Sequence, residues 1–434
     1  MAGLNEGLES GSNWTDQDLN KFGIQYHITV TEPSGIFEKV KPYTIGTRIS
    51  LNDLAVQKLT EYTTMLQENF NDAFVLDVNS FELIEMIDAC NMCNEMRGTC
   101  RGSGDLKTKY AASEIEAKWK EIHKNVRLNI AGAKSQLLTA RLKAVSKSWD
   151  PTFVMIDTFL TKVNKVLRKA SPSNLEVNEG TFVDLFQHFA RIFLVEFIPA
   201  MVKRSLMMGG MEVTSINDLR YDYEDHESYD RCEDAPTIVV TVAEVKKGAK
   251  RKKLHCRKRK QRISKVQRTE GRDNVGGANA AAAADDDEYD DDIDNDEDGD
   301  TGDRNPSDII DDDRVEFSSR LRGQLGIELL ADIDRSCLKE VNNKRMILGL
   351  TVEATWVRLT CMELNDVAAF REVQKKPPRE DAPHIATIYY TRAYDMLARS
   401  DRSVLIYIMR YLLFLSNDTA ESHLPKLLHG FLRD

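Results

Sequence analysis

Residues 113–138 read SEIEAKWKEIHKNVRLNIAGAKSQLL, and this stretch decides the fold class that the sequence predicts. Its apolar residues, beginning with Ile115 and Trp119, recur at steps of three or four, the spacing that places side chains on one face of an α-helix. The same stripe continues in both directions, so we expect one long helix over about 106–149. Pro151 ends it, because proline disfavours helical backbone in the residue before it.

Helical spacing recurs on both sides of this stretch, whereas only Tyr26–Thr31 and Thr237–Val245 have the β-branched character of strands. Opposite charges do not pair along the apolar stripe, which favours bundle packing over a coiled-coil arm. The sequence therefore predicts a mainly α fold, an irregular multi-helix bundle in two lobes with one or two short strands. The further helices are expected over about 51–70, 83–96, 152–169, 181–208, 321–341, 347–370, 384–398, 401–415 and 424–432.

A long charged insert separates the two lobes. Residues 246–268 contain 13 Lys and Arg and no acid, whereas residues 285–313 contain 17 Asp and Glu and one Arg. The two blocks nearly cancel within a chain whose net charge is −11, so the rest of the chain is ordinary in charge. Large apolar residues are scarce in the insert, which therefore cannot bury enough surface to offset its ordering entropy. We expect it to be disordered.

The expected domain organisation follows from these boundaries. It comprises a disordered tail at 1–20, an N-terminal helical lobe at 21–215, an acidic segment with a candidate strand at 216–245, the basic-then-acidic insert at 246–314 and a C-terminal helical lobe at 315–434. The longest apolar runs, 189–202 and 404–415, contain charged residues and are too short to span a bilayer, so no membrane contact is expected. Seven scattered cysteines indicate reduced, intracellular thiols.

The basic block has the composition of a nuclear localisation signal, because import receptors recognise exposed strings of Lys and Arg. A nuclear import receptor and a nuclear location are therefore expected. The same residues can neutralise nucleic-acid phosphates, but no aromatic side chain interleaves them, so such binding would be non-specific. A merely solvated linker is the third interpretation. The residues concerned are Lys250, Arg251, Lys252, Lys253, Arg257, Lys258, Arg259 and Lys260.

The acidic block is a candidate contact for histones or other basic partners. It also lies close enough along the chain to mask the basic block, because the short linker between them keeps the two at high effective concentration. A third interpretation is that it only keeps the chain soluble. The residues at its start are Asp285, Asp286, Asp287, Glu288, Asp290, Asp291 and Asp292.

No metal, cofactor or catalytic site is expected. Cys90, Cys93 and Cys100, with His123 as a fourth candidate, resemble zinc ligands, but the first two continue the apolar side of a helix and no second CxxC follows. The acidic run at 294–305 starts like a calcium loop but ends in Asn instead of Glu. No phosphate-binding glycine loop, GxSxG, HExxH or kinase motif is present, so the chain is not expected to be an enzyme.

The expected function is that of a non-catalytic nuclear adaptor or scaffold in a chromatin, DNA-maintenance or ribonucleoprotein complex. Its helical surfaces would bind other proteins, and its basic block would contact nucleic acid or leave that contact to its partners. The alternative is a chaperone of histones or other basic proteins that acts through the acidic tract, and an enzyme ranks third.

Overall fold

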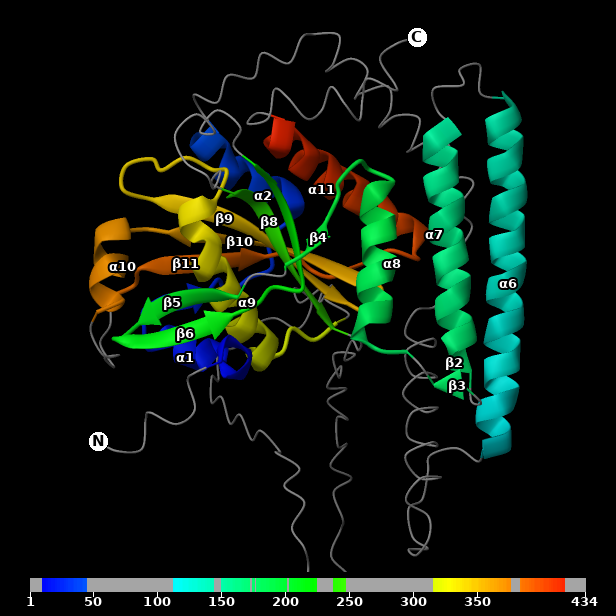
Figure 1. The fold of residues 1–434 in the computed structure, drawn as a ribbon, viewed down its shortest axis with the longest axis horizontal. Coiled ribbons are helices and arrows are strands. Elements are labelled where there is room, and N and C mark those ends of the chain that lie inside the picture. The colour runs from blue at the N-terminus through cyan, green and yellow to red at the C-terminus, as the bar shows by residue number, and fades with distance from the viewer. Residues whose placement is uncertain are drawn as a thin grey trace, which may run out of the picture. The chain divides into compact units, whose positions relative to one another are not determined.

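The computed structural model describes residues 10–44, 112–143, 150–171, 174–175, 177–200, 203–224, 237–246, 315–375 and 383–417. All of them belong to one compact unit, drawn from both sides of the charged insert. A mixed sheet forms its centre, and helices pack against the sheet (Figure 1).

Eight strands make up the sheet within the described part of the chain. They are β1 (Ile24–Tyr26), β4 (Ile198–Pro199), β7 (Leu219–Glu224), β8 (Thr237–Lys246), β9 (Arg345–Glu353), β10 (Trp356–Leu364), β11 (Ala386–Tyr390) and β12 (Tyr394–Asp395). Their order is β1-β11-β10-β9-β8-β7-β4, with β12 also paired to β10. The β1–β11 and β8–β9 pairs are parallel, and the other pairs are antiparallel.

Two apolar cores cover the two faces of the sheet. Helices α2 (Pro33–Val40), α7 (Asp150–Lys169), α8 (Glu179–Arg191) and α11 (Arg399–Asn417) contribute to the first core. The second core takes side chains from α1 (Asp16–Asn20), α9 (Ser319–Asp332), α10 (Val367–Val373) and the hairpin of β5 (Arg204–Met208) and β6 (Met211–Ser215). Short 3₁₀ turns lie at Gly11–Asn13, Lys41–Thr44 and Ile333–Arg335, and the small β2–β3 ladder pairs Ala170–Ser171 with Asn174–Leu175.

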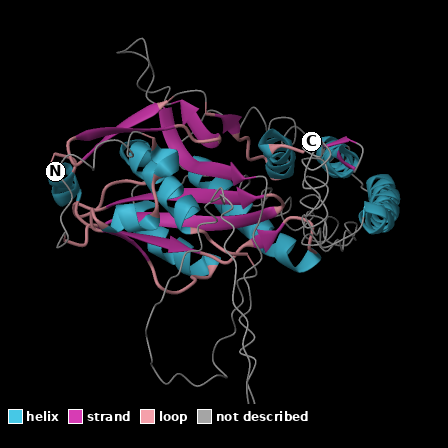
Figure 2. Ribbon diagram, turned by 90° about the horizontal axis from the view of Figure 1, so that it is seen from below, coloured by secondary structure: helices cyan, strands magenta, loops and turns pink. Residues whose placement is uncertain are grey.

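Three helices extend the molecule sideways from the sheet. Phe186 of α8 packs near the sheet, α7 packs on α8, and α6 (Ala112–Lys143) packs on α7. The three lie side by side in Figure 1, and Figure 2 shows them end-on as a row beside the sheet. The apolar stripe of α6 is buried against its neighbour at Ile122, Val126 and Ile130.

The prediction of a mainly α-helical chain with one or two short strands is wrong, because the eight-stranded sheet is the centre of the fold. The expected helix at 347–370 instead forms β9, β10 and the short α10. Both faces of β9 are covered, so its side chains are buried almost without interruption and show no alternation. A strand buried on both faces has the same continuous apolar sequence as a buried helix. The turn before β10 is also hidden, since Ala354 and not glycine adopts the positive φ of 57° there.

Two further expected helices contain strands. The expected helix at 181–208 ends at Arg191, and the chain then forms β4 and β5. The expected helix at 384–398 forms β11 and β12. The helices α7 and α11 and the strand β8 are confirmed within two residues of their expected bounds, and α6 confirms residues 112–143 of the long helix expected over 106–149. In the described ranges, no helix is long and apolar enough to cross a membrane.

The charged insert interrupts a crossover between two parallel neighbours. β8 precedes the insert and β9 follows it, yet the two pair in parallel from Thr241 with Leu348 to Lys246 with Glu353. Parallel neighbours need a long connection, and α9 packs on the sheet within this one. The two sequence lobes thus contribute adjacent strands to a single sheet. The basic and acidic blocks themselves lie outside the described residues.

Residues 10–20 are folded, although the sequence places them in a disordered tail. Trp14 is completely buried, and Thr15 caps α1 through a capping box with Asp18. Gly323 of α9 permits this packing, because a Cβ at that position would lie 2.2 Å from the carbonyl oxygen of Trp14. Two completely buried side chains, Trp14 and Leu19, therefore tie this segment to the second core.

Candidate functional site

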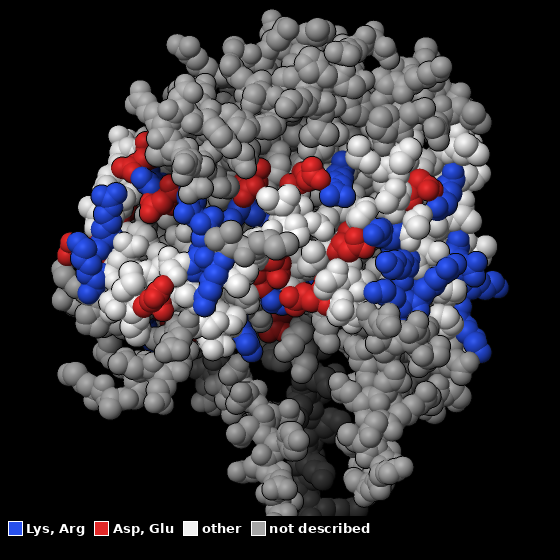
Figure 3. Space-filling view, viewed as in Figure 1, with Lys and Arg blue, Asp and Glu red and all other residues white. Residues whose placement is uncertain are grey.

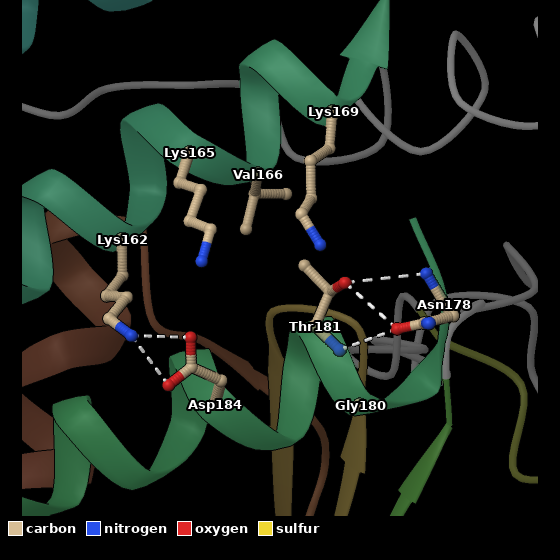
Figure 4. Close-up of a pocket in the computed structure, with 8 residues that line it drawn as sticks. All are labelled: Lys162, Lys165, Val166, Lys169, Asn178, Gly180, Thr181 and Asp184. Carbon is tan, nitrogen blue, oxygen red and sulfur yellow. Dashed lines mark hydrogen bonds and ion pairs between the residues drawn. The ribbon is translucent and has the colours of Figure 1, made fainter. Parts of the chain in front are cut away.

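A pocket of about 270 Å³ lies between α7 and the first turn of α8. Lys162, Lys165 and Lys169 share one face of α7, because residues three, four and seven apart are neighbours on a helix. Figure 4 shows their side chains extending toward α8. Among the described residues, the lining consists of Lys162, Lys165, Val166, Lys169, Asn178, Gly180, Thr181 and Asp184.

The opposite wall of the pocket is the amino end of α8. The Asn178 side chain accepts a hydrogen bond from the Thr181 backbone N–H at 3.0 Å and thereby caps the helix. Gly180 leaves this wall without a side chain. A Cβ there would meet only the side-chain oxygen Oδ1 of Asn178 within 4 Å. The positive end of the α8 dipole adds to the charge of the lysines.

The charge of the lining is strongly positive. Lys162 donates to both carboxylate oxygens of Asp184, at 2.8 and 2.7 Å. Lys165 and Lys169 have no acidic partner among the residues that the structure describes. Three ammonium groups thus face one carboxylate, which gives the described residues of the lining a net charge of +2. We call this site the lysine pocket.

The lysine pocket is continuous with a wider basic surface. α6 and α7 together contain eleven Lys and Arg and five Asp and Glu, although the whole chain has a net charge of −11. Figure 3 shows Lys and Arg side chains gathered over these helices. Burial lowers the pKa of His123, and the positive charges of Arg127 on α6 and Arg168 on α7 lower it further. We call the outer faces of α6 and α7 the basic surface.

The chemistry of the lysine pocket is that of anion binding. The ammonium groups and the side-chain NH₂ of Asn178 can donate hydrogen bonds to an oxyanion, whereas the Thr181 hydroxyl already donates to Asn178 Oδ1 at 3.0 Å. The one carboxylate among the described residues of the lining is already paired with Lys162. The arrangement therefore offers charge and orientation to a bound anion.

A second cavity, of about 420 Å³, lies where the chain enters and leaves the insert. Its lining carries equal numbers of opposite charges and so favours neither an anion nor a cation. The residues are Ser12, Lys246, Glu316, Ser318, Arg320, Leu321, Gln324 and Glu353. The charge of this second cavity selects no class of ligand. The lysine pocket is therefore the better candidate site.

A buried polar seam lies beneath this second cavity. Gln324, Glu328 and Asp332 follow one another at four-residue steps on α9 and face the sheet. Gln324 donates to Glu328 at 3.2 Å and also to Glu244 of β8, which is paired with Lys246 as well. We call these α9 residues and their partners on the sheet the α9 seam.

Two carboxyl groups of the α9 seam, those of Glu244 and Glu328, have raised pKa values. Burial and the nearby Asp218 raise the pKa of Glu244 to about 7. Burial and the charge of Glu244 raise the pKa of Glu328 well above its ordinary value. Two carboxylates in contact in a low-dielectric interior cannot both ionise at neutral pH.

At the other end of the seam, Asp332 is completely buried. Its Oδ2 accepts from Arg220 at 2.7 Å and from Asn217 at 2.8 Å, while Arg204 lies 3.7 Å from its Oδ1. The seam therefore binds the helix that follows the insert to strands that precede it.

The residues singled out from the sequence do not form this site. The basic block at 250–260 and the acidic block at 285–292 lie outside the described residues, as do Cys90, Cys93 and Cys100. His123 is described, and its ring stacks on Trp119 at 4.7 Å. No group of three potential metal ligands occurs in the ranges that the structure covers.

Sequence reasoning placed α7 correctly but missed its lysines as a site. The spacing K-x-x-K-x-x-x-K from Lys162 to Lys169 is visible in the sequence, and so is the capping pattern that begins at Asn178. The sequence does not reveal that α7 packs against α8 with these lysines facing the start of α8. A search for basic residues on one helix face beside a helix start would have found it.

Comparison with known proteins adds no relative. No family model, curated protein or solved structure matches the chain. The functional argument therefore rests on the residues and geometry of the chain itself.

Proposed function

We propose that the protein is a non-catalytic nuclear adaptor that contacts nucleic acid through the basic surface of α6 and α7. The observation that carries this proposal is the net charge of +6 on two helices of an acidic chain. A basic face on an otherwise acidic protein attracts polyanions, because phosphate contacts release condensed counterions.

The nuclear part of the proposal rests on the basic block at 250–260. Its Lys and Arg strings fit an import receptor, and they would also add phosphate contacts to those of the basic surface. Replacement of these eight basic residues by alanine is expected to move a fluorescently tagged chain from the nucleus to the cytoplasm. Retention in the nucleus would contradict the assignment of the signal.

A charge-reversal experiment tests the nucleic-acid contact. Lys124→Glu/Arg127→Glu changes two exposed residues of α6, and Lys41→Glu/Lys375→Glu makes the same change of charge at exposed positions elsewhere. Fluorescence anisotropy with double-stranded DNA and single-stranded RNA, at several salt concentrations, measures the affinity of each full-length variant.

The α6 variant is expected to bind about tenfold more weakly, with the slope of log K against log salt reduced by about 2. The loss is partial, because the basic block still contributes contacts. The control is expected to bind like the wild type. Equal losses in the two variants would mean that only total charge matters and would refute the assignment to the basic surface.

A further inference from the structure

We infer that the lysine pocket binds a dianionic phosphate monoester, and that its source is the phosphorylated end of a nucleic-acid strand. The assignment to a strand end rests on the proposed function. The assignment to a phosphate monoester rests on the pocket alone.

The first argument is charge balance. Lys162, Lys165 and Lys169 face the carboxylate of Asp184, so the described residues of the lining have a net charge of +2. A phosphate monoester carries nearly two negative charges at pH 7, because its second pKa is about 6. A phosphodiester within a strand carries one. The monoester is therefore the phosphate form that neutralises the pocket.

The second argument is the convergence of the lysines. Like charges four residues apart on a helix face repel each other, as Lys165 and Lys169 do. No acidic residue of the described ranges pairs with either of them, and both line the same cavity as the paired Lys162. A bound dianion would turn this repulsion into three charge-assisted hydrogen bonds.

The third argument is size and position. At about 270 Å³, the pocket has room for a phosphate group. The start of α8 closes one side of the pocket, with Gly180 leaving room for an oxyanion. The remainder of the strand must lie outside the pocket, where the basic surface of α7 and α6 continues.

The test compares single-stranded oligonucleotides of one sequence, phosphorylated at the 5′ end, at the 3′ end or at neither. Fluorescence anisotropy with the full chain is expected to show one phosphorylated form binding about tenfold more tightly than the unphosphorylated strand, the effect of one good charged hydrogen-bond set. Lys165→Gln/Lys169→Gln should abolish this preference and retain most of the binding of the unphosphorylated strand.

A matched control separates the pocket from the basic surface. Lys120→Gln/Lys124→Gln removes the same charge from exposed positions of α6 and should weaken all three oligonucleotides equally, with the preference intact. Retention of the preference in Lys165→Gln/Lys169→Gln would overturn the assignment to the pocket. Equal binding of all three strands by the wild type would overturn the strand-end inference and leave the proposed function standing.

Two further measurements distinguish the sources of phosphate. Titration with inorganic phosphate, followed by calorimetry, should show binding to the wild type and not to Lys165→Gln/Lys169→Gln, and absence of binding to both would overturn the phosphate site. If phosphate binds but no oligonucleotide does, the proposed function fails and the pocket stands. A phosphoserine peptide that binds more tightly than the phosphorylated strand, through the same lysines, would overturn the strand end as its source.

Discussion

The lysine pocket and the α9 seam are built on the same helical spacing but differ in what faces it. On α7 the lysines point toward the capped end of α8, and only one of them meets an acid among the described residues. On α9 the polar residues face other parts of the same fold, since Asp332 accepts from Arg220 and Asn217, and Gln324 donates to Glu244. A polar stripe whose partners come from the same fold stabilises that fold. A stripe without such partners is available to a ligand.

Burial makes the energetic difference between the two regions. Lys165 is exposed, so water screens its charge and the folded state gains or loses little from it. Asp332 is completely buried, so loss of one partner leaves a charge without compensation in a low dielectric. Four predictions test this contrast, in order of decreasing expected effect.

The largest effect is expected at the buried end of the α9 seam. Asp332→Ala should lower the free energy of unfolding by about 3–5 kcal/mol, because it removes the carboxylate to which the buried Arg220 guanidinium donates at 2.7 Å and leaves it only Asp222, 3.9 Å away. Urea denaturation followed by circular dichroism measures the loss. Asp334→Ala, whose side chain is 74% exposed and paired with Arg345, is the control and should cost less than about 1 kcal/mol. Similar losses in both variants would contradict the contrast.

The raised pKa values of Glu244 and Glu328 should make the free energy of unfolding fall as pH rises. The folded state raises the pKa of Glu328 and Glu244, so it favours their protonated forms. Their contribution is complete below the ordinary pKa near 4.5 and is lost as pH rises toward about 7, with a slope of at most about 1.4 kcal/mol per pH unit for each proton.

The Glu328→Gln variant should reduce this dependence, because its own side chain stays neutral while burial and Asp218 still raise the pKa of Glu244. The difference in unfolding free energy between variant and wild type should therefore shift in favour of the variant between pH 5 and pH 8. Urea denaturation at each pH measures this difference. A difference that stays constant over this range would contradict the raised pKa of Glu328.

Two glycines, Gly323 on α9 and Gly132 on α6, differ in how tightly their surroundings are packed. Gly323→Ala on α9 should cost about 1–3 kcal/mol, because its Cβ would lie 2.2 Å from the Trp14 carbonyl oxygen. Gly132→Ala on α6 has nothing within 4 Å of its Cβ and should stabilise the protein by up to about 1 kcal/mol. Thermal denaturation of the two variants checks the signs, and a shift of the same sign in both would contradict the expectation.

The smallest effect on stability is expected at the lysine pocket. Lys165→Ala/Lys169→Ala should change the free energy of unfolding by about 0.5 kcal/mol or less, because it removes solvated charges that repel each other. Urea denaturation with and without 10 mM inorganic phosphate, at constant ionic strength, measures this change. Phosphate should stabilise the wild type more than the variant, as a ligand that binds only the folded state does. A destabilisation of several kcal/mol would instead give these lysines a structural role.

The helices of the lysine pocket were predictable, but the pocket was not. The apolar periodicity of α6 and α7 is strong because each helix buries one face and exposes the other. The pocket forms because Lys169 and Asn178 line the same cavity, and that depends on how α7 packs against α8. The α9 seam was hidden further, since Glu328 and Asp332 look like surface acids in the sequence.

The sequence by itself determined the long helices of the α6–α7 region, the terminal helix α11, the strand β8 and the distribution of charge along the chain. These features depend on local periodicity and composition, which a single segment contains. Only the tertiary structure decided that β8 and β9 pair across the insert, that β9 and β10 are strands, and that three lysines converge on the start of α8. The physical reason is burial on both faces, which removes the alternation that marks a strand, and contact between residues far apart in the chain.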